Sequence, residues 1–234
     1  MHIPTDDVLW FAPPPDVRRV VPHARVLCLA PHPDDECIGP GGSLAMHRSQ
    51  GDPVRVAIGT DGQAGDPDRR FAADTYGERR RRESRAGLAE LGIDDVVFWG
   101  LPDSCVITEN DLDMLAARIG DEIEAVRPDL VYAPWEGEGN DDHRALYAGL
   151  VRALKRRRPR VEVLGYEIWN LMLPDVIHDV SGVIDRKERA IRCFETQMAY
   201  TDILRPTLGL NASRSMIFNH GVGYGEAFRR VVVP

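Results

Sequence analysis

Short apolar segments with the length and composition of buried β-strands recur along the chain, and segments with helical spacing separate them. The strand-like segments span residues 25–30, 54–60, 95–100, 129–135 and 161–169. The helical segments span residues 42–50, 74–91, 109–126, 142–157 and 185–199. Strands that are apolar throughout and alternate with helices are typical of a mostly parallel sheet with helices on both faces. The pattern predicts a Rossmann-like α/β fold, with an active site at the carboxyl ends of the strands.

Residues 25–234 are predicted to form one domain of this kind, for which their number is ordinary. Residues 1–24 are proline-rich and are predicted to be an N-terminal extension that packs on the outside of the domain. The segment 62–70 is polar and rich in glycine and proline, which predicts a mobile loop at the carboxyl edge of the sheet. From about residue 200 the sequence has no clear period, and we expect this tail to wrap around the domain.

The charge balance narrows the choice of partner and location. The chain has 29 Lys and Arg residues against 37 Asp and Glu residues, a net charge of −8. This excess of acids disfavours nucleic acid and anionic membranes as partners. No apolar run approaches the length of about 20 residues that spans a bilayer, so no integral membrane association is expected. The N-terminal stretch MHIPTDDVLWFAPPPD has acids and prolines where a signal peptide needs a basic start and an apolar core, so we expect a cytoplasmic protein.

The cysteines offer neither a disulfide framework nor a thiolate metal site. Cys28, Cys37, Cys105 and Cys193 are scattered along the chain and form no C-x-x-C pair. Three of them lie in or beside apolar stretches. We therefore expect reduced thiols in the core.

The stretch PHPDDE, residues 31–36, follows the first strand-like segment directly. It places one histidine and three acids at the carboxyl edge of the predicted sheet. Like charges side by side repel, and their burial is costly unless a cation or hydrogen bonds compensate. The stretch therefore indicates that these acids bind a cation.

A catalytic zinc ion takes three protein ligands, commonly histidine and carboxylate, and keeps one position open for water. His32 and Asp35, three residues apart in a tight turn, are predicted to converge on one ion, while Asp34 stays free to act as a base. The third predicted ligand is His143, which follows the fourth strand-like segment at the start of a helix. Its neighbour Asp142 is the candidate acid for orienting it. Four further histidines are expected to be helix caps or surface groups: His23, His47, His178 and His220.

Several segments, in this order, resemble the LmbE/PIG-L family of zinc-dependent N-acetylglucosaminyl deacetylases. They read APHPDDECIGPGG, TDGQAG, ERRRRESRAGLAELGI, FWGLPDS and NDDHRALY, and they cover roughly residues 25–150. The later YEIW, DRKERAIRCFETQ and GYGEAF are similar to family elements but less specific. The resemblance implies a small-molecule or glycoconjugate substrate that carries an N-acetylated amino sugar.

The resemblance also implies roles for single residues. The three ligands His32, Asp35 and His143 would hold Zn²⁺, or Fe²⁺ in the cell, and Asp34 would be the general base. Sugar-facing roles fall to two further residues, Arg80 by spacing within the ERRRRE run and Asp103 of LPDS.

One position departs from the family pattern, which usually has a histidine three residues before the second ligand histidine. Asn140 occupies this position here. Asparagine donates a hydrogen bond to an oxyanion but carries no charge and transfers no proton. The sequence leaves two roles open for Asn140, an oxyanion donor or a cap of the helix that begins near Asp142.

Three functions remain open from the sequence. The leading one is removal of acetyl from an N-acetylated amino sugar, by a metal-activated water and Asp34. The second is an amidase that cleaves a thiol conjugate or another amide, and the third is a metal-containing sugar-binding protein with little turnover. The sequence leaves open the aglycone of the substrate. It also leaves open the oligomeric state, which includes the possibility of a homo-oligomer.

Overall fold

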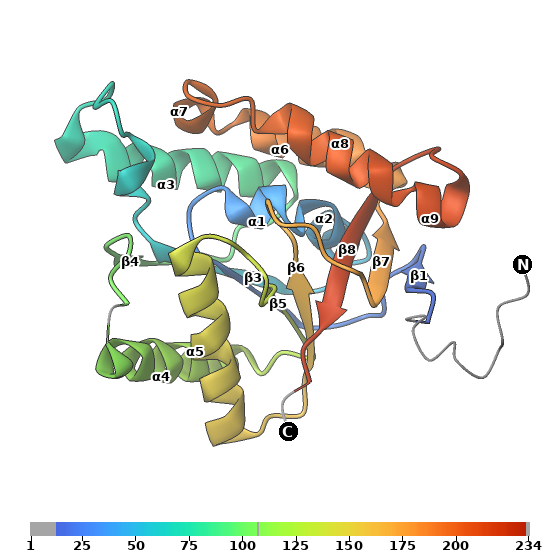
Figure 1. Cartoon of the computed structure of the whole chain (residues 1–234), viewed down its shortest axis with the longest axis horizontal. Coiled ribbons are helices and arrows are strands. Elements are labelled where there is room, and N and C mark those ends of the chain that lie inside the picture. The colour runs from blue at the N-terminus through green and yellow to red at the C-terminus, as the bar shows by residue number, and fades with distance from the viewer. Residues whose placement is uncertain (1–12, 107, 233–234) are drawn as a thin grey trace, which may run out of the picture.

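The computed structural model describes residues 13–106 and 108–232. In this part of the chain the strands form one mixed sheet, in the order β1-β7-β8-β6-β5-β2-β3-β4 (Figure 1). The strands are β1 (Asp16–Arg18), β2 (Val26–Ala30), β3 (Val54–Thr60), β4 (Val96–Leu101), β5 (Leu130–Pro134), β6 (Glu162–Tyr166), β7 (Val176–Asp179) and β8 (Gly225–Arg230). All neighbouring strands are parallel except that β8 runs antiparallel to β6 and β7.

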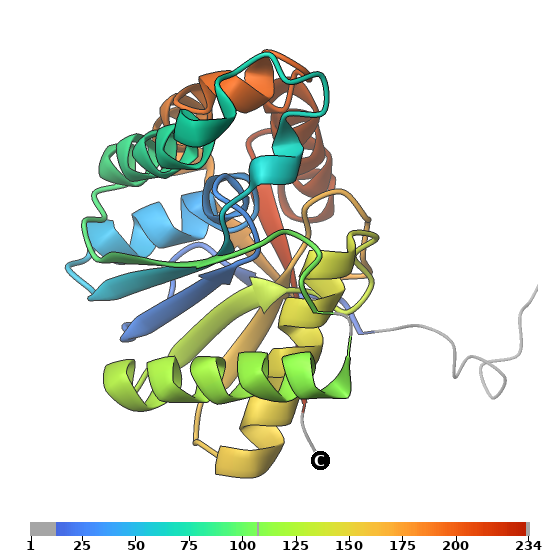
Figure 2. The same ribbon diagram turned by 90° about the vertical axis from the view of Figure 1, so that its left-hand side faces the viewer.

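Helices cover both faces of the sheet (Figures 1 and 2). One face carries α1 (Asp35–Ile38), α2 (Gly41–Ser49), α3 (Ala73–Glu90), α6 (Ile184–Arg192) and α8 (Leu204–Arg214). The other face carries α4 (Glu109–Val126) and α5 (Asp141–Arg157). The remaining short elements are η2 (Gln63–Gly65), η3 (Ser181–Val183), α7 (Glu195–Met198) and α9 (Met216–Asn219). Among the helices that the structure describes, none combines the length and the apolar character that crossing a membrane requires.

The two apolar cores meet in β2, the strand in front of PHPDDE. Its residues Val26, Cys28 and Ala30 pack into the core under α2, α3 and α6. Leu27 and Leu29 pack into the opposite core under α4 and α5. Successive side chains of a strand point to opposite faces, so a strand between two covered faces must be apolar at every position. This explains why β2 and its neighbours are continuous apolar runs in the sequence.

Local signals also fix the helices, as α4 illustrates. It begins at a capping box, in which Thr108 Oγ1 accepts a hydrogen bond from the backbone N–H of Asp111. Its apolar residues fall on one face, and Leu115, Ile119 and Ile123 are buried at spacings of four. Both predictions made for this segment, a helix and its bounds at 109–126, are confirmed.

The predicted fold class is confirmed, but several elements of the C-terminal third differ from the prediction. The tail after residue 200 forms α8 and then β8, which inserts between β6 and β7. The helix predicted at 185–199 is interrupted near Phe194 and continues as α7. Strands β7 and β8 carry polar residues such as His178 and Glu226, and their partners are distant in sequence, so no local apolar run marks them.

The predicted N-terminal extension, residues 1–24, lies partly outside the described residues, which begin at residue 13. Within the described part, Asp16–Arg18 form the edge strand β1, which pairs in parallel with β7. This part of the extension therefore belongs to the sheet. The division of the chain at residue 25 stays a prediction.

Candidate active site

A cavity of about 500 Å³ opens at the carboxyl edge of the sheet. The loops that follow β2, β3, β4, β5 and β6 form most of its wall, together with α3 and the segment after α7. Its lining residues are His32, Asp34, Asp35, Gly62, Ala64, Gly65, Arg80, Asp103, Ser104, Asn140, Asp142, His143, Trp169, Gln197, Tyr200, Thr201 and Ile203. Every residue to which the sequence analysis assigned a site role is among them. A cavity of this volume suits a small-molecule ligand.

The turn after β2 holds Asp34 in an unusual backbone conformation. Its φ is 149°, in a region that residues other than glycine rarely adopt. The N–H of Asp34 donates to Glu36 Oε2 at 2.9 Å, and Ser84 Oγ donates to Glu36 Oε1 at 2.5 Å. Buried Glu36 thus fixes the turn from behind. Glu36 is one of the three acids of PHPDDE, and no separate role was predicted for it from the sequence.

The three predicted metal ligands come together around one carboxylate oxygen. His32 Nδ1 lies 3.1 Å and His143 Nε2 lies 3.2 Å from Asp35 Oδ2. One ligand atom from each of the three residues lies within 4.8 Å of the others. His32 and Asp35 come from one turn after β2, and His143 comes from the first turn of α5, after β5. Because β2 and β5 are adjacent parallel strands, their carboxyl ends deliver the three side chains to one place.

The outer nitrogen of each histidine faces a further carboxylate. His32 Nε2 lies 3.2 Å from Asp142 Oδ2, and His143 Nδ1 lies 3.5 Å from Glu138 Oε2. The prediction that Asp142 orients its neighbour His143 is therefore wrong, because the carboxylate of Asp142 faces His32. The carboxylate of Asp142 accepts the backbone N–H of Ser104, which turns it toward His32. Glu138 is the acid beside His143, and the polar stretch EGEGN gave no signal that this glutamate is buried.

These residues fit a divalent transition-metal ion. Two imidazoles and one carboxylate are a donor set that zinc and iron accept. Carboxylates that face the outer nitrogens are the usual arrangement behind metal-binding histidines. Within the described residues, His143 Nδ1 and Glu138 Oε2 face each other at 3.5 Å, and neither atom has another partner.

The electrostatics of the site show an excess of negative charge. Burial alone would lower the pKa of both histidines, but the carboxylates outweigh it. Hydrogen bonds with Asp142 and Asp35 raise the pKa of His32 to about 10. The charge and hydrogen bond of Asp35 raise the pKa of His143 to about 9. Burial alone would raise the pKa of Asp35, yet the facing His143 and His32 hold it well below its usual range.

The predicted base, Asp34, is paired with Arg80. Arg80 Nη2 donates to Asp34 Oδ2 at 3.0 Å and to the carbonyl of Pro33, and Nη1 donates to the carbonyl of Gly62 at 3.0 Å. Burial raises the pKa of Asp34 to about 6, and the charge of Arg80 acts in the opposite direction. The side chain of Arg80 is only 2% exposed. Its guanidinium therefore holds the base and the Gly62 loop, and its predicted contact with a sugar stays a prediction.

Asp103 shapes the same loop from the other side. Its carboxylate accepts the backbone N–H groups of Gly62 at 3.1 Å and of Ala64 at 2.6 Å. Gly62 has a positive φ of 69°, and a Cβ there would lie 2.8 Å from Arg80 Nη1. The loop after β3 is thus held between Arg80 and Asp103, and the sugar-facing role of Asp103 stays a prediction.

Asn140 caps helix α5. Its Oδ1 accepts the backbone N–H of Asp142 at 2.8 Å and that of His143 at 3.4 Å. The residue is exposed and lies on the rim of the cavity. The helix occupies its amide oxygen, so Nδ2 is the group with which Asn140 can reach a substrate.

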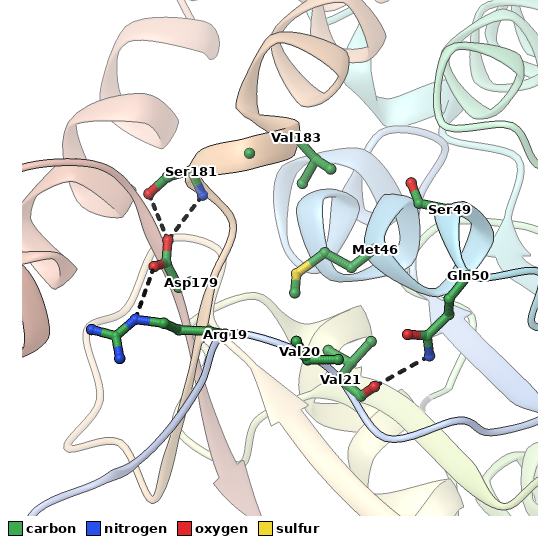
Figure 3. A pocket seen from close by; sticks show the side chains of 10 residues that line it. Arg19, Val20, Val21, Met46, Ser49, Gln50, Asp179, Ser181 and Val183 are labelled. Carbon is green, nitrogen blue, oxygen red and sulfur yellow. Dashed lines mark hydrogen bonds and ion pairs between the residues drawn. The ribbon is translucent and has the colours of Figure 1, made fainter.

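A second cavity, of about 400 Å³, lies at the carboxyl ends of β1 and β7 (Figure 3). Its polar groups bind one another, since Asp179 accepts hydrogen bonds from the N–H and the hydroxyl of Ser181 and lies 3.9 Å from Arg19 Nε. Met46 of α2 and Val183 of η3 add apolar surface. Among the described residues, the cavity shares no lining residue with the first one. The predicted ligands and base line the first cavity, which is therefore the candidate active site.

Two of the histidines that were expected to be caps or surface groups are core residues instead. His47 Nδ1 lies 2.7 Å from Asp52 Oδ2, and His178 Nδ1 lies 2.9 Å from Ser43 Oγ. Both imidazoles are fully buried. The local sequence around these two histidines does not distinguish them from exposed ones. Neither lines the first cavity.

The sequence comparisons agree with the motifs. The model of the PIG-L family, described as GlcNAc-PI de-N-acetylase, matches residues 27–154. A relative from Bacillus subtilis (strain 168), described as a probable N-acetyl-alpha-D-glucosaminyl L-malate deacetylase 2, is 34% identical over 194 residues. A relative with the same description from Bacillus cereus is 31% identical over 187 residues. Each match covers 74% of this chain and 83% of the relative.

The fold is also found in solved structures. The conserved protein TT1542 from Thermus thermophilus has a TM-score of 0.75 to this chain at 22% identity. The match covers 90% of this chain and 95% of that protein. A likeness at this identity shows the α/β fold, and the predicted fold class is confirmed by it.

Proposed function

This chain belongs to the PIG-L family, and from that premise we propose that it is a metal-dependent hydrolase that removes the acetyl group from an N-acetylated amino sugar, a GlcNAc-type conjugate. One observation carries the proposal. The side chains of His32, Asp35 and His143 converge, with Asp34 beside them, in a cavity of about 500 Å³. A metal site with an adjacent carboxylate base is an arrangement that can hydrolyse an unactivated amide.

We assign Zn²⁺ to His32, Asp35 and His143, with Fe²⁺ as the alternative in the cell. When bound, such an ion supplies a Lewis acid that lowers the pKa of water and polarises a carbonyl group. Asp142 and Glu138 hold the imidazoles of His32 and His143 in the orientation that ligation needs.

Asp34 is the proposed general base and, once protonated, the acid for the departing amine. Its carboxylate takes the proton of the attacking water and returns it to the nitrogen of the sugar. Burial raises the pKa of this carboxylate, which favours return of the proton to the departing amine. Arg80 fixes the side chain at 3.0 Å, and Glu36 fixes the backbone at 2.9 Å, so the base is oriented before the substrate arrives.

Asn140 has a second proposed role beside its cap. Its Nδ2 donates a hydrogen bond to the oxyanion that develops on the acetyl carbonyl. Its place on the cavity rim, three residues before His143, supports this role. Arg80 and Asp103 act on the sugar chiefly through the loop after β3, which both of them hold.

Acetate release tests the proposal. The purified protein is freed of metal, reloaded with Zn²⁺ or Fe²⁺, and incubated with a panel of N-acetylated aminosugar conjugates and N-acyl thiol conjugates, with metal content measured in parallel. We expect one ion per chain and acetate release from the sugar conjugates alone. Cleavage of the thiol conjugates alone would support the amidase. Full metal content and sugar binding without release from any conjugate would support the sugar-binding protein.

A further inference from the structure

The catalytic cavity offers no free cation to an anionic aglycone within the described residues. The acids that line it are Asp34, Asp35, Asp103 and Asp142, and the lining cation other than histidine is Arg80. Arg80 is 2% exposed, and its two terminal nitrogens already donate to Asp34, Pro33 and Gly62. A carboxylate on the substrate would therefore face four acids and find no arginine or lysine among the described lining residues whose terminal nitrogens are unoccupied.

Two arginines next to lining residues do not change this balance. Arg70 stacks on the ring of Tyr200 at 4.1 Å and pairs with Asp68 at 2.8 Å. Arg144 follows His143 in α5 and pairs with Asp141, while its Nη1 donates to the carbonyl of Gly139. Each of these two arginines is therefore already paired with an acidic side chain.

An aromatic side chain lies open on the same cavity. Trp169 lines it and is 48% exposed, although the preceding Ile168 is buried. Tyr200 and Ile203 add further apolar lining from the segment after α7. An exposed indole in a cavity is a flat surface on which an apolar group of a ligand can stack.

A buried carboxylate fixes this indole relative to the metal ligands. Glu138 Oε1 accepts the backbone N–H groups of Ile168 at 2.7 Å, Trp169 at 3.3 Å and Asn170 at 3.4 Å. The second oxygen of Glu138 faces His143 Nδ1 at 3.5 Å. One side chain thus ties the loop that carries Trp169 to the catalytic centre, so a group stacked on the indole has a set position relative to the reacting atoms.

We propose that Trp169 is the platform for the aglycone and that the substrate is an N-acetylated amino sugar whose aglycone is uncharged and apolar, an aryl or alkyl group, rather than an anion. The inference rests on the proposed deacetylation and adds to it the class of substrate.

Three glycosides of N-acetylglucosamine that differ only in the aglycone test it: benzyl, methyl and malyl. We expect kcat/KM for the benzyl glycoside to exceed that for the malyl glycoside about tenfold or more. In Trp169→Ala, the ratio of the benzyl to the methyl value should fall to about one, because the stacking surface is gone. Leu173→Ala is the matched control, since Leu173 is an exposed apolar residue of the same segment that does not line the cavity, and it should keep the wild-type ratio.

A malyl value equal to or above the benzyl value would overturn the inference, as would an unchanged ratio in Trp169→Ala. Calorimetric binding of the benzyl glycoside to Asp34→Asn separates this failure from failure of the proposed function. Binding that depends on Trp169, without turnover by the wild type, would refute the deacetylation and support the platform. Absence of both binding and turnover would refute the inference as well.

Discussion

Two of the charged clusters that the described residues bury beside helices α1 and α2 differ in how their charges are balanced. In the first, the Glu226 cluster, Lys187 Nζ lies 2.6 Å from Glu226 Oε1, and the same carboxylate accepts the N–H groups of Gly42 and Ser43 at 2.7 and 2.8 Å. One acidic side chain is thus paired with one basic side chain, and backbone N–H groups donate further hydrogen bonds to the carboxylate. The second, the catalytic cluster around PHPDDE, places several carboxylates against one arginine and two imidazoles.

The difference distinguishes a cluster that stabilises the fold from a cluster that forms a functional site. A balanced buried ion pair with its hydrogen bonds completed holds elements together, here β8 and α6 against the start of α2. An unbalanced cluster is costly to fold unless an ion or a ligand completes it, so its retention at a cavity points to a site. Strain points the same way, because Asp34 in the catalytic cluster has a φ of 149°.

The largest effect is expected where the catalytic cluster performs the chemistry. In Asp34→Asn, kcat should fall on the order of 10²–10⁴-fold while metal content stays at the wild-type level, because the amide is no base but Asp34 is no ligand. In Asp35→Asn, the metal itself should be lost. Acetate release and elemental analysis on the same preparations measure both.

Asp141→Asn is the matched control for this pair. Asp141 is an exposed acid in the first turn of α5 that pairs with Arg144 and does not line the cavity. It should keep both metal and rate. Equal loss of metal in the Asp34 and Asp35 variants would show that the two roles are misassigned.

The next effect concerns the stability of the Glu226 cluster. Lys187→Met should lower the free energy of unfolding by about 3–5 kcal/mol, because it leaves the charge of Glu226 buried without a partner. The melting temperature should fall by roughly 6–20 °C for a chain of this size. Adding Glu226→Gln should recover part of the loss, since the remaining buried group is then neutral. Denaturant unfolding of the single and double variants measures it.

Arg189→Met controls for the loss of a cation on the same helix. Arg189 lies two residues further along α6 and pairs with Glu90 at 2.7 Å on the surface. A surface pair contributes at most about 1 kcal/mol, so this variant should unfold nearly like the wild type. If Lys187→Met instead kept its stability and lost metal, the separation between the two clusters would be wrong.

A third effect tests the link between Glu138 and His143. Glu138→Gln should keep the amide oxygen as an acceptor for the Trp169 loop but remove the charge that faces the imidazole. Metal affinity should then fall about 10–100-fold, as for other carboxylates behind a ligating histidine. Competition with a chelator measures the affinity. Glu136→Gln, an exposed position in the same loop, should leave it unchanged; equal affinities for all three proteins would argue that Glu138 serves the loop alone.

The catalytic cluster could be located from the sequence because each of its main residues follows an apolar strand. The runs before His32 and His143 predict β2 and β5, and parallel strands bring their carboxyl ends together. The Glu226 cluster could not be found this way. Its residues lie in β8, α6 and α2, and their partners are 39 and 184 residues apart in the sequence. No local period records a contact over such distances.

Inside the site, the sequence predicted which of the proposed ligands come together better than it predicted the side chains that support them. Ligand identity follows from residue type and strand order, whereas support depends on where a side chain turns. Asp142 illustrates this limit, since its carboxylate lies beside His32 and not beside its sequence neighbour His143. Glu138, and not Asp142, faces His143. Arg80 is a further case, because its burial against Asp34 is set by the packing of α3 on the turn after β2.

The smallest effect is expected at Asn140, where a cap and an oxyanion donor can be told apart. Asn140→Ala removes both, whereas Asn140→Ser keeps a good cap and removes only the amide N–H group. The alanine variant should lose about 1 kcal/mol of unfolding free energy relative to the serine variant. Because Asn140 is exposed, its hydrogen bond to an oxyanion competes with water, and kcat should fall only about tenfold in both variants, with KM little changed. Wild-type turnover by Asn140→Ser would leave the residue as the cap of α5 alone, since the serine hydroxyl still receives the N–H groups that Asn140 Oδ1 receives now.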